Sequence, residues 1–309
     1  MDKNVGVYKG WIVVGASFVT YMVVWGGVWY SFSVFLNVFV REFYWGKGEV
    51  AGVFSICVAI ICLSAPLVGG TFDYFGPKYI MPVAAIFLGA NLFLCTRINS
   101  LFDFYLYYGI GCGIGMSFLL FRAQAPIITR WFHIHRATAM GLGLSGSGIG
   151  MMVFVPLIQR VAINSGWCAG FLLLSATVVF LVFPASFILA KLPRKGETQH
   201  ETGLLSGRKG ASRKKTRVVT MDPSWARRVW TPREALRTRR FWYLFFAGVS
   251  GSALVVQTIF SHFIIMATDT GYSSVFSSKM LGLADLMGTA GFLFWGKLAD
   301  RIGREWGYT

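Results

Sequence analysis

Apolar residues gather along the chain into long blocks that are separated by short polar segments. Each block is about 20 residues long, which is the length an α-helix needs to cross about 30 Å of hydrocarbon at 1.5 Å per residue. The pattern therefore predicts an all-α membrane protein. The expected spans lie at about residues 11–38, 50–70, 79–96, 104–128, 138–160, 169–190, 241–266 and 276–296.

One long polar segment interrupts this pattern at residues 191–240, which are rich in Gly, Ser and basic residues and have few groups suited to a core. We expect a basic cytoplasmic linker here. It would separate a six-helix N-terminal half, residues 1–190, from the first two helices of a C-terminal half, residues 241–309. Within the linker, residues 231–234 read Thr-Pro-Arg-Glu, an N-cap followed by a proline and a glutamate, which predicts a short interfacial helix.

Composition supports a membrane protein and limits its partners. Of the 309 residues 55% are apolar and only 14% are charged, which is about half the charged fraction of an ordinary soluble domain. A net charge of +16 fits either nucleic acid or a membrane surface, so the placement of the 29 Lys and Arg decides between them. Most of them lie on one side of the predicted spans. The other side carries Arg41, Lys47, Arg97, Arg160 and Lys279.

This asymmetry predicts the orientation of the chain. By the positive-inside rule, both termini belong in the cytoplasm, and a plasma (inner) membrane is the expected location. Anionic lipid is the expected partner of the basic linker, and no nucleic-acid partner is expected. A plain topological signal without a specific lipid partner is the alternative for the same charges.

Signals for catalysis, metals and cofactors are missing from the sequence. The five cysteines form no CxxC pair, and there is no HExxH, no paired carboxylates and no Ser with His and Asp in one membrane layer. We therefore expect neither an enzyme nor a metal or cofactor site. Residues 141–150 contain a GxGxxG pattern, but no βαβ unit surrounds it. The spacing of Gly146 and Gly150 instead predicts close helix packing.

One loop pattern occurs twice, at residues 69–78 and 296–304. In each copy Gly, Asp and Gly recur at the same spacing, and a basic residue follows the last Gly one or two positions later. Glycines here permit a tight turn, and the Asp can meet a helix N-terminus. The motif residues are Gly69, Asp73, Gly76 and Lys78 in the first copy, and Gly296, Asp300, Arg301, Gly303 and Arg304 in the second, where Arg301 has the counterpart Tyr74 in the first. This pattern resembles the loop signature of the major facilitator superfamily. The resemblance implies an internally duplicated transporter whose loop motifs take part in conformational change.

Shorter pieces resemble one branch of that superfamily. Gly10-Trp11, Arg130-Trp131-Phe132 and Gly166-Trp167 are similar to the monocarboxylate porters and oxalate:formate antiporters. That resemblance implies a small organic anion as substrate, typically a monocarboxylate, moved with a proton or by exchange. The branch commonly has an arginine in helix 8 where this chain has Phe292, which leaves a different substrate open.

Three ionisable residues lie well inside predicted spans, where burying a charge costs at least about 2.5 to 3.5 kcal/mol. They are Arg122, His262 and Asp285. Arg122 would hold a carboxylate, His262 would bind substrate or a proton, and Asp285 would bind a proton. The structural alternatives are a backbone partner or an interfacial position for the arginine and an interhelical hydrogen bond for the aspartate.

Four further residues are candidates for lining a substrate cavity: Trp29, Tyr30, Asn91 and Gln257. The alternative is that such side chains face lipid or neighbouring helices.

The helix count adds a last expectation. A complete transporter of this kind has two six-helix halves and about 400 residues, whereas the predicted spans here end after helix 8. We expect an incomplete fragment that does not transport by itself. A non-transporting membrane receptor or assembly protein that reuses the fold is the alternative function.

Overall fold

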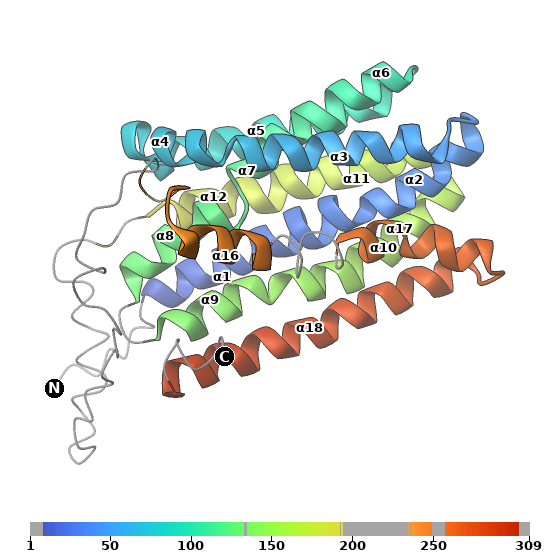
Figure 1. Cartoon of the computed structure of the whole chain (residues 1–309). Coiled ribbons are helices and arrows are strands. Elements are labelled where there is room, and N and C mark those ends of the chain that lie inside the picture. The colour runs from blue at the N-terminus through green and yellow to red at the C-terminus, as the bar shows by residue number, and fades with distance from the viewer. Residues whose placement is uncertain are drawn as a thin grey trace, which may run out of the picture.

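The computed structural model describes residues 9–132, 135–191, 193, 234, 236–248 and 257–302. Every element in these ranges is a helix, and the longer helices lie side by side as a bundle (Figure 1). The described chain begins at Lys9 and ends at Ile302, at the same end of this bundle (Figure 1).

The first three spans differ in how straight they are. The first runs without a break from Lys9 to Glu42. The second is bent by 49° between its two helices, because Pro66 near the start of the second helix supplies no backbone N–H. The elements are α1 (Lys9–Tyr21), η1 (Met22–Trp29), α2 (Tyr30–Glu42), α3 (Lys47–Leu63), α4 (Ala65–Phe75), α5 (Pro77–Leu94) and η2 (Cys95–Arg97).

The next three spans complete an N-terminal bundle of residues 9–191. The fourth span is interrupted after Ser117 and restarts at Phe121. The elements are α6 (Leu101–Phe104), η3 (Tyr105–Cys112), α7 (Gly113–Ser117), α8 (Phe121–Trp131), α9 (Arg136–Leu144), α10 (Gly146–Ser165), α11 (Trp167–Thr177), η4 (Val178–Val182) and α12 (Phe183–Leu189).

Three helices follow the linker: α16 (Arg239–Gly248), α17 (Gln257–Asp269) and α18 (Ser274–Ile302). The long α18 packs along α9 and α10, and α17 packs against α2 (Figure 1). These contacts join the C-terminal helices to the N-terminal bundle over most of its length.

The predicted fold class is confirmed by these elements. Within the described residues, five helices are long and apolar enough to cross a membrane, and the bent pair α3 and α4 makes up to six. They correspond to the first six predicted spans. The predicted seventh span falls partly on residues 249–256, which lie outside the described residues. Residues 194–233 of the linker, including the start of its predicted short helix and most of its expected lipid contacts, also lie outside them. Glu234 and Leu236 are helical.

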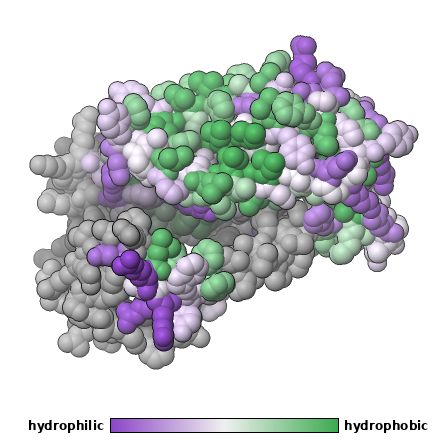
Figure 2. Space-filling model, turned by 45° about the horizontal axis from the view of Figure 1, so that its top comes forward, coloured by the Kyte–Doolittle hydropathy of each residue, from purple (hydrophilic) through white to green (hydrophobic). Residues whose placement is uncertain are grey.

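Apolar side chains occupy both the inside and the outer face of the bundle. Phe32, Phe35 and Phe104 are almost fully buried, and they pack as stacked and edge-on ring pairs with their neighbours. On the outside, Val83 is 66% exposed and Phe180 76%. Figure 2 shows a broad hydrophobic band on one face, with hydrophilic residues toward the two ends. Such a band suits contact with lipid chains.

The glycines of the fifth span allow close approach to its neighbours. A Cβ added at Gly26 of η1 would lie 2.6 Å from the Cα of Gly150, and one added at Gly148 would lie 2.7 Å from the carbonyl oxygen of Asp285 in α18. Side chains larger than hydrogen would therefore separate the helices. The predicted close packing at Gly146 and Gly150 is confirmed, because a Cβ added at either position would overlap a backbone carbonyl of the first span.

Candidate functional site

The break in the fourth span creates a helix N-terminus inside the bundle. Leu120 is extended, with φ −78° and ψ 176°, and α8 begins at the next residue. The first N–H groups of a helix have no intrahelical acceptor. Here the N–H of Phe121 donates to the hydroxyl of Tyr21, 2.9 Å away in α1. Tyr21 thus holds the new helix end in place.

Arg122 is the second residue of α8, so its charge lies at this N-terminus. Its side chain is exposed, with Nη1 3.4 Å from the carbonyl oxygen of Ile61 in α3, and it lies within electrostatic range of Tyr21. The positive end of the helix dipole and the guanidinium both favour an anion. The backbone partner named above as the structural alternative for Arg122 is therefore present, but at the long limit of a hydrogen bond.

Aromatic rings continue from Tyr21 along the first span. Trp25 stacks on Trp29 with ring centroids 4.7 Å apart and an interplanar angle of 7°. The indole N–H of Trp25 donates to the hydroxyl of Tyr30 over 3.2 Å. The indole nitrogen of Trp29 is buried and has no hydrogen-bond partner within the described residues. Trp25 and Trp29 belong to η1, a π-helical stretch, and such stretches are frequent at functional sites.

Asp285 of α18 lies near the other end of this aromatic row. It is within electrostatic range of Tyr30, and its Oδ2 is buried without a hydrogen-bond partner in the described part of the chain. Buried polar atoms normally have partners, so an orphaned carboxyl oxygen indicates a site for a proton, a water molecule or a ligand. The row from Arg122 through Tyr21, Trp25 and Tyr30 to Asp285 is the candidate site.

The other predicted site residues lie elsewhere. His262 is exposed on α17, and among the described residues no contact joins it to Arg122 or Asp285. Asn91 is buried in α5. Its side-chain amide donates to the carbonyl of Phe87 over 2.9 Å, and its side-chain oxygen packs against Gly111. Gln257 begins α17, but its side chain lies outside the described residues.

The two loop motifs are described to different extents. In the first copy, Gly76 has a φ of 77° and ends α4 with its N–H 3.1 Å from the carbonyl of Phe72. Asp73 and Lys78 are exposed beside this turn, and a Cβ at Gly69 would meet nothing. The second copy lies at the end of α18. The backbone of Gly296, Asp300 and Arg301 is helical, but their side chains are not described, and Gly303 and Arg304 lie outside the described residues.

An ion pair that the sequence did not reveal joins the two parts of the chain at the opposite end of the bundle. Lys47 at the start of α3 lies 2.8 Å from Asp269 at the end of α17. Five residues after Asp269, the hydroxyl of Ser274 in α18 accepts a hydrogen bond of 3.4 Å from the side-chain amide of Gln159 in α10. Lys47 and Asp269 are 222 residues apart, so no local pattern could have paired them.

Comparison with known proteins agrees with this architecture. The model of the Major Facilitator Superfamily matches residues 10–308. The chain is 24% identical over 305 residues to "MFS-type transporter pytF" of Aspergillus terreus, covering 97% of this chain and 92% of that protein. It is 32% identical over 173 residues to "Monocarboxylate transporter 13" of Rattus norvegicus, covering 56% of this chain and 40% of that protein.

A third relative is "Monocarboxylate transporter 2" of Homo sapiens, which is 25% identical over 219 residues, covering 69% of this chain and 45% of that protein. The chain thus spans less than half the length of these two monocarboxylate transporters. Together with the apolar spans, the family match makes it an integral multi-pass membrane protein. The chain belongs to the major facilitator superfamily, and its relatives support the predicted monocarboxylate transporter branch.

Proposed function

We propose that this protein is a secondary active transporter of a small organic anion, most simply a monocarboxylate, that works by alternating access with proton coupling or exchange. The observation that carries the proposal is the helix break in the fourth span, which places Arg122 at the N-terminus of α8 inside the bundle. Discontinuous membrane helices whose N-termini point toward anionic substrate groups are a recurring feature of transporters.

In this proposal, Arg122 and the first N–H groups of α8 hold the carboxylate of the substrate. The aromatic rings of Trp25 and Trp29 give the rest of a small substrate an apolar surface, and the unpartnered indole N–H of Trp29 can donate to it. A single carboxylate with a short apolar body fits one cation beside stacked rings.

Asp285 is the proposed proton site. Its Oδ2, which has no partner among the described residues, can gain a proton without losing a hydrogen bond. Because Asp285 lies on α18, which packs along α9 and α10, protonation would act at the contact between the two halves. His262 is a second proposed coupling residue, since imidazole gains or loses a proton near neutral pH. We further propose a plasma (inner) membrane location with both termini in the cytoplasm, which places the Lys47–Asp269 pair on the outer side.

The experiment compares binding of radiolabelled acetate, propionate and lactate by the purified chain and its variants. Arg122→Ala should lower apparent affinity tenfold or more, because a hydrogen bond to a charged group contributes roughly 1.5 to 3 kcal/mol. Arg122→Lys should keep part of the wild-type affinity, because the lysine retains the positive charge. Arg130→Ala removes an exposed cation from the same helix and should change affinity less than twofold. Equal losses in Arg122→Ala and Arg130→Ala would contradict the assignment.

Uptake separates the transporter from the receptor alternative. In cells that make the protein from its own gene, Arg122-dependent accumulation of the anion is expected. Arg122-dependent binding without accumulation would favour a receptor. Sustained Arg122-dependent uptake by vesicles that contain the purified chain would support the transporter.

A further inference from the structure

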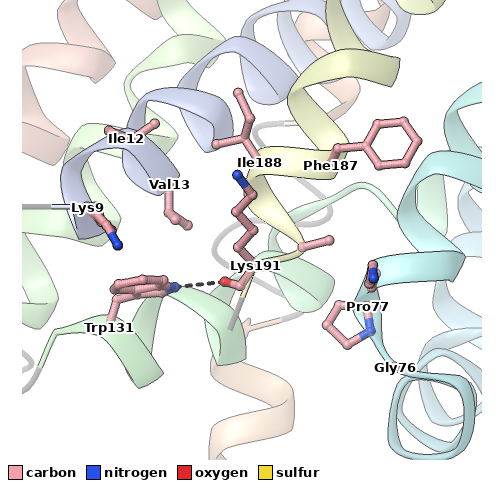
Figure 3. Close-up of a pocket in the computed structure, with 11 residues that line it drawn as sticks. Lys9, Ile12, Val13, Gly76, Pro77, Trp131, Phe187, Ile188 and Lys191 are labelled. Carbon is pink, nitrogen blue, oxygen red and sulfur yellow. Dashed lines mark hydrogen bonds between the residues drawn. The ribbon is translucent and has the colours of Figure 1, made fainter. Parts of the chain in front are cut away.

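Four membrane spans end around one cavity, on the side of the bundle where the described chain begins. Its volume is about 850 Å³. Lining residues come from Lys9 at the start of α1, Pro77 at the start of α5, Trp131 at the end of α8 and Lys191 just after α12 (Figure 3). Since each of these residues lies at or next to an end of an apolar span, we place the cavity at the depth of lipid headgroups.

The charge of the cavity is of one sign. Three lysines, Lys9, Lys78 and Lys191, line it, and none of the lining residues that the structure describes is acidic. All three lysines are exposed, and Lys78 also lies over the ring of Tyr79, with its Nζ 5.6 Å from the centroid. Three ammonium groups around one opening attract a ligand with a phosphate or another compact anion.

The walls are held in place before any ligand arrives. The indole N–H of Trp131 donates to the carbonyl of Lys191 over 2.9 Å, as Figure 3 shows, and the N–H of Lys191 donates to the carbonyl of Ile188 over 3.2 Å. On the opposite wall, the turn at Gly76, with its φ of 77°, places Pro77 and Lys78 at the cavity. A preformed site costs less ordering free energy on binding.

Apolar side chains complete the lining. Val13 is buried in the wall, while Ile12 and Phe187 line the cavity and are 51% and 47% exposed. A free phosphate would gain nothing from these two side chains. A ligand with hydrocarbon chains below an anionic headgroup would contact both the lysines and the apolar residues.

We propose that this cavity binds the headgroup of an anionic phospholipid, with its phosphate among Lys9, Lys78 and Lys191 and its acyl chains against Ile12 and Phe187. The described lining residues come from the N-terminal bundle and from Lys191, the first residue of the linker, and none of them belongs to the substrate site proposed above.

The test titrates the purified 309-residue chain in detergent with phosphatidylglycerol or phosphatidylcholine of identical acyl chains, and measures bound lipid by native mass spectrometry. The wild-type chain should bind phosphatidylglycerol more tightly. A triple Lys9→Gln, Lys78→Gln and Lys191→Gln variant should lose at least tenfold in affinity for it, since each lysine near an anionic headgroup contributes about fivefold. The corresponding triple Lys→Arg variant should retain binding.

The matched control removes three exposed cations from the other side of the predicted spans, Arg41, Arg97 and Arg160, by substitution with Gln. If basic residues attract lipid only through net charge, both triple variants lose affinity equally and the proposal is overturned. It is also overturned if the Lys→Gln triple binds phosphatidylglycerol like the wild type, or if glycerol phosphate displaces the lipid at equal concentration, which would indicate a soluble phosphate site. Equal thermal unfolding temperatures of the variants establish that the fold persists.

Discussion

At the scale of single residues, Tyr21 has the clearest structural task, because its hydroxyl accepts the N–H that begins α8. Tyr21→Phe leaves this N–H without its acceptor. We expect the free energy of unfolding to fall by about 1 to 3 kcal/mol, together with weaker monocarboxylate binding because the helix end near Arg122 is less well placed. Denaturation in mixed detergent and ligand binding measure the two effects.

The matched control is Tyr105→Phe. The Tyr105 hydroxyl donates to the carbonyl of Glu49 over 2.8 Å at an exposed position, where water replaces a lost partner. Its removal should cost less than half as much stability and leave binding unchanged. If the two variants behave alike, the role assigned to Tyr21 is wrong.

At the scale of elements, glycines set how closely the helices approach. A Cβ at Gly150 would overlap the backbone carbonyl of Met22 in η1. Gly150→Ala should therefore lower the free energy of unfolding by about 1 to 3 kcal/mol, the typical cost of overpacking. Gly15→Ala, in α1 with open space around the added methyl group, should instead stabilise by about 0.5 to 1 kcal/mol. Thermal unfolding in detergent compares them, and a neutral Gly150→Ala would refute the tight contact.

The ion pair between α3 and α17 is a candidate gate for the proposed alternating access. Lys47 and Asp269 have side chains 57% and 59% exposed, so the pair contributes only about 0 to 1 kcal/mol to stability. The proposed transport cycle, however, requires the outer ends of these helices to separate. Asp269→Lys should widen the distance between spin labels on the outer ends of α3 and α17, and the swap Lys47→Asp with Asp269→Lys should restore it. A swap that behaves like the single variant would exclude a gating role.

At the scale of the whole molecule, the proposed orientation assigns each helix end to one side of the membrane. Cys168 begins the sixth span and is exposed, and Lys191 follows its other end. In a Cys62→Ser background, a membrane-impermeant maleimide should label Cys168 in intact cells. In a chain that also carries Cys168→Ser, Lys191→Cys should react only after permeabilisation. The reverse pattern would establish the opposite orientation.

The apolar pattern alone determined the first six spans and the helical fold class. In hydrocarbon, backbone N–H and C=O groups can form hydrogen bonds only with each other. An apolar block of about 20 residues therefore forms a membrane-spanning α-helix. Arg122 and Asp285 could be selected for the same reason, because charges inside spans are costly. Glycine spacing likewise predicted the tight contact of α10, since a missing side chain permits close packing wherever the neighbour lies.

Tertiary structure alone decided which residues meet. No Pro or Gly lies at the break around Leu120 to predict it, and the N–H of Phe121 that follows it donates to Tyr21, 100 residues away. Lys47 and Asp269 pair across 222 residues, and the lysine-lined cavity forms only where four span ends converge. Hydrophobic periodicity places residues along a helix, but the rotation and register of one helix against another depend on the summed packing of all of them.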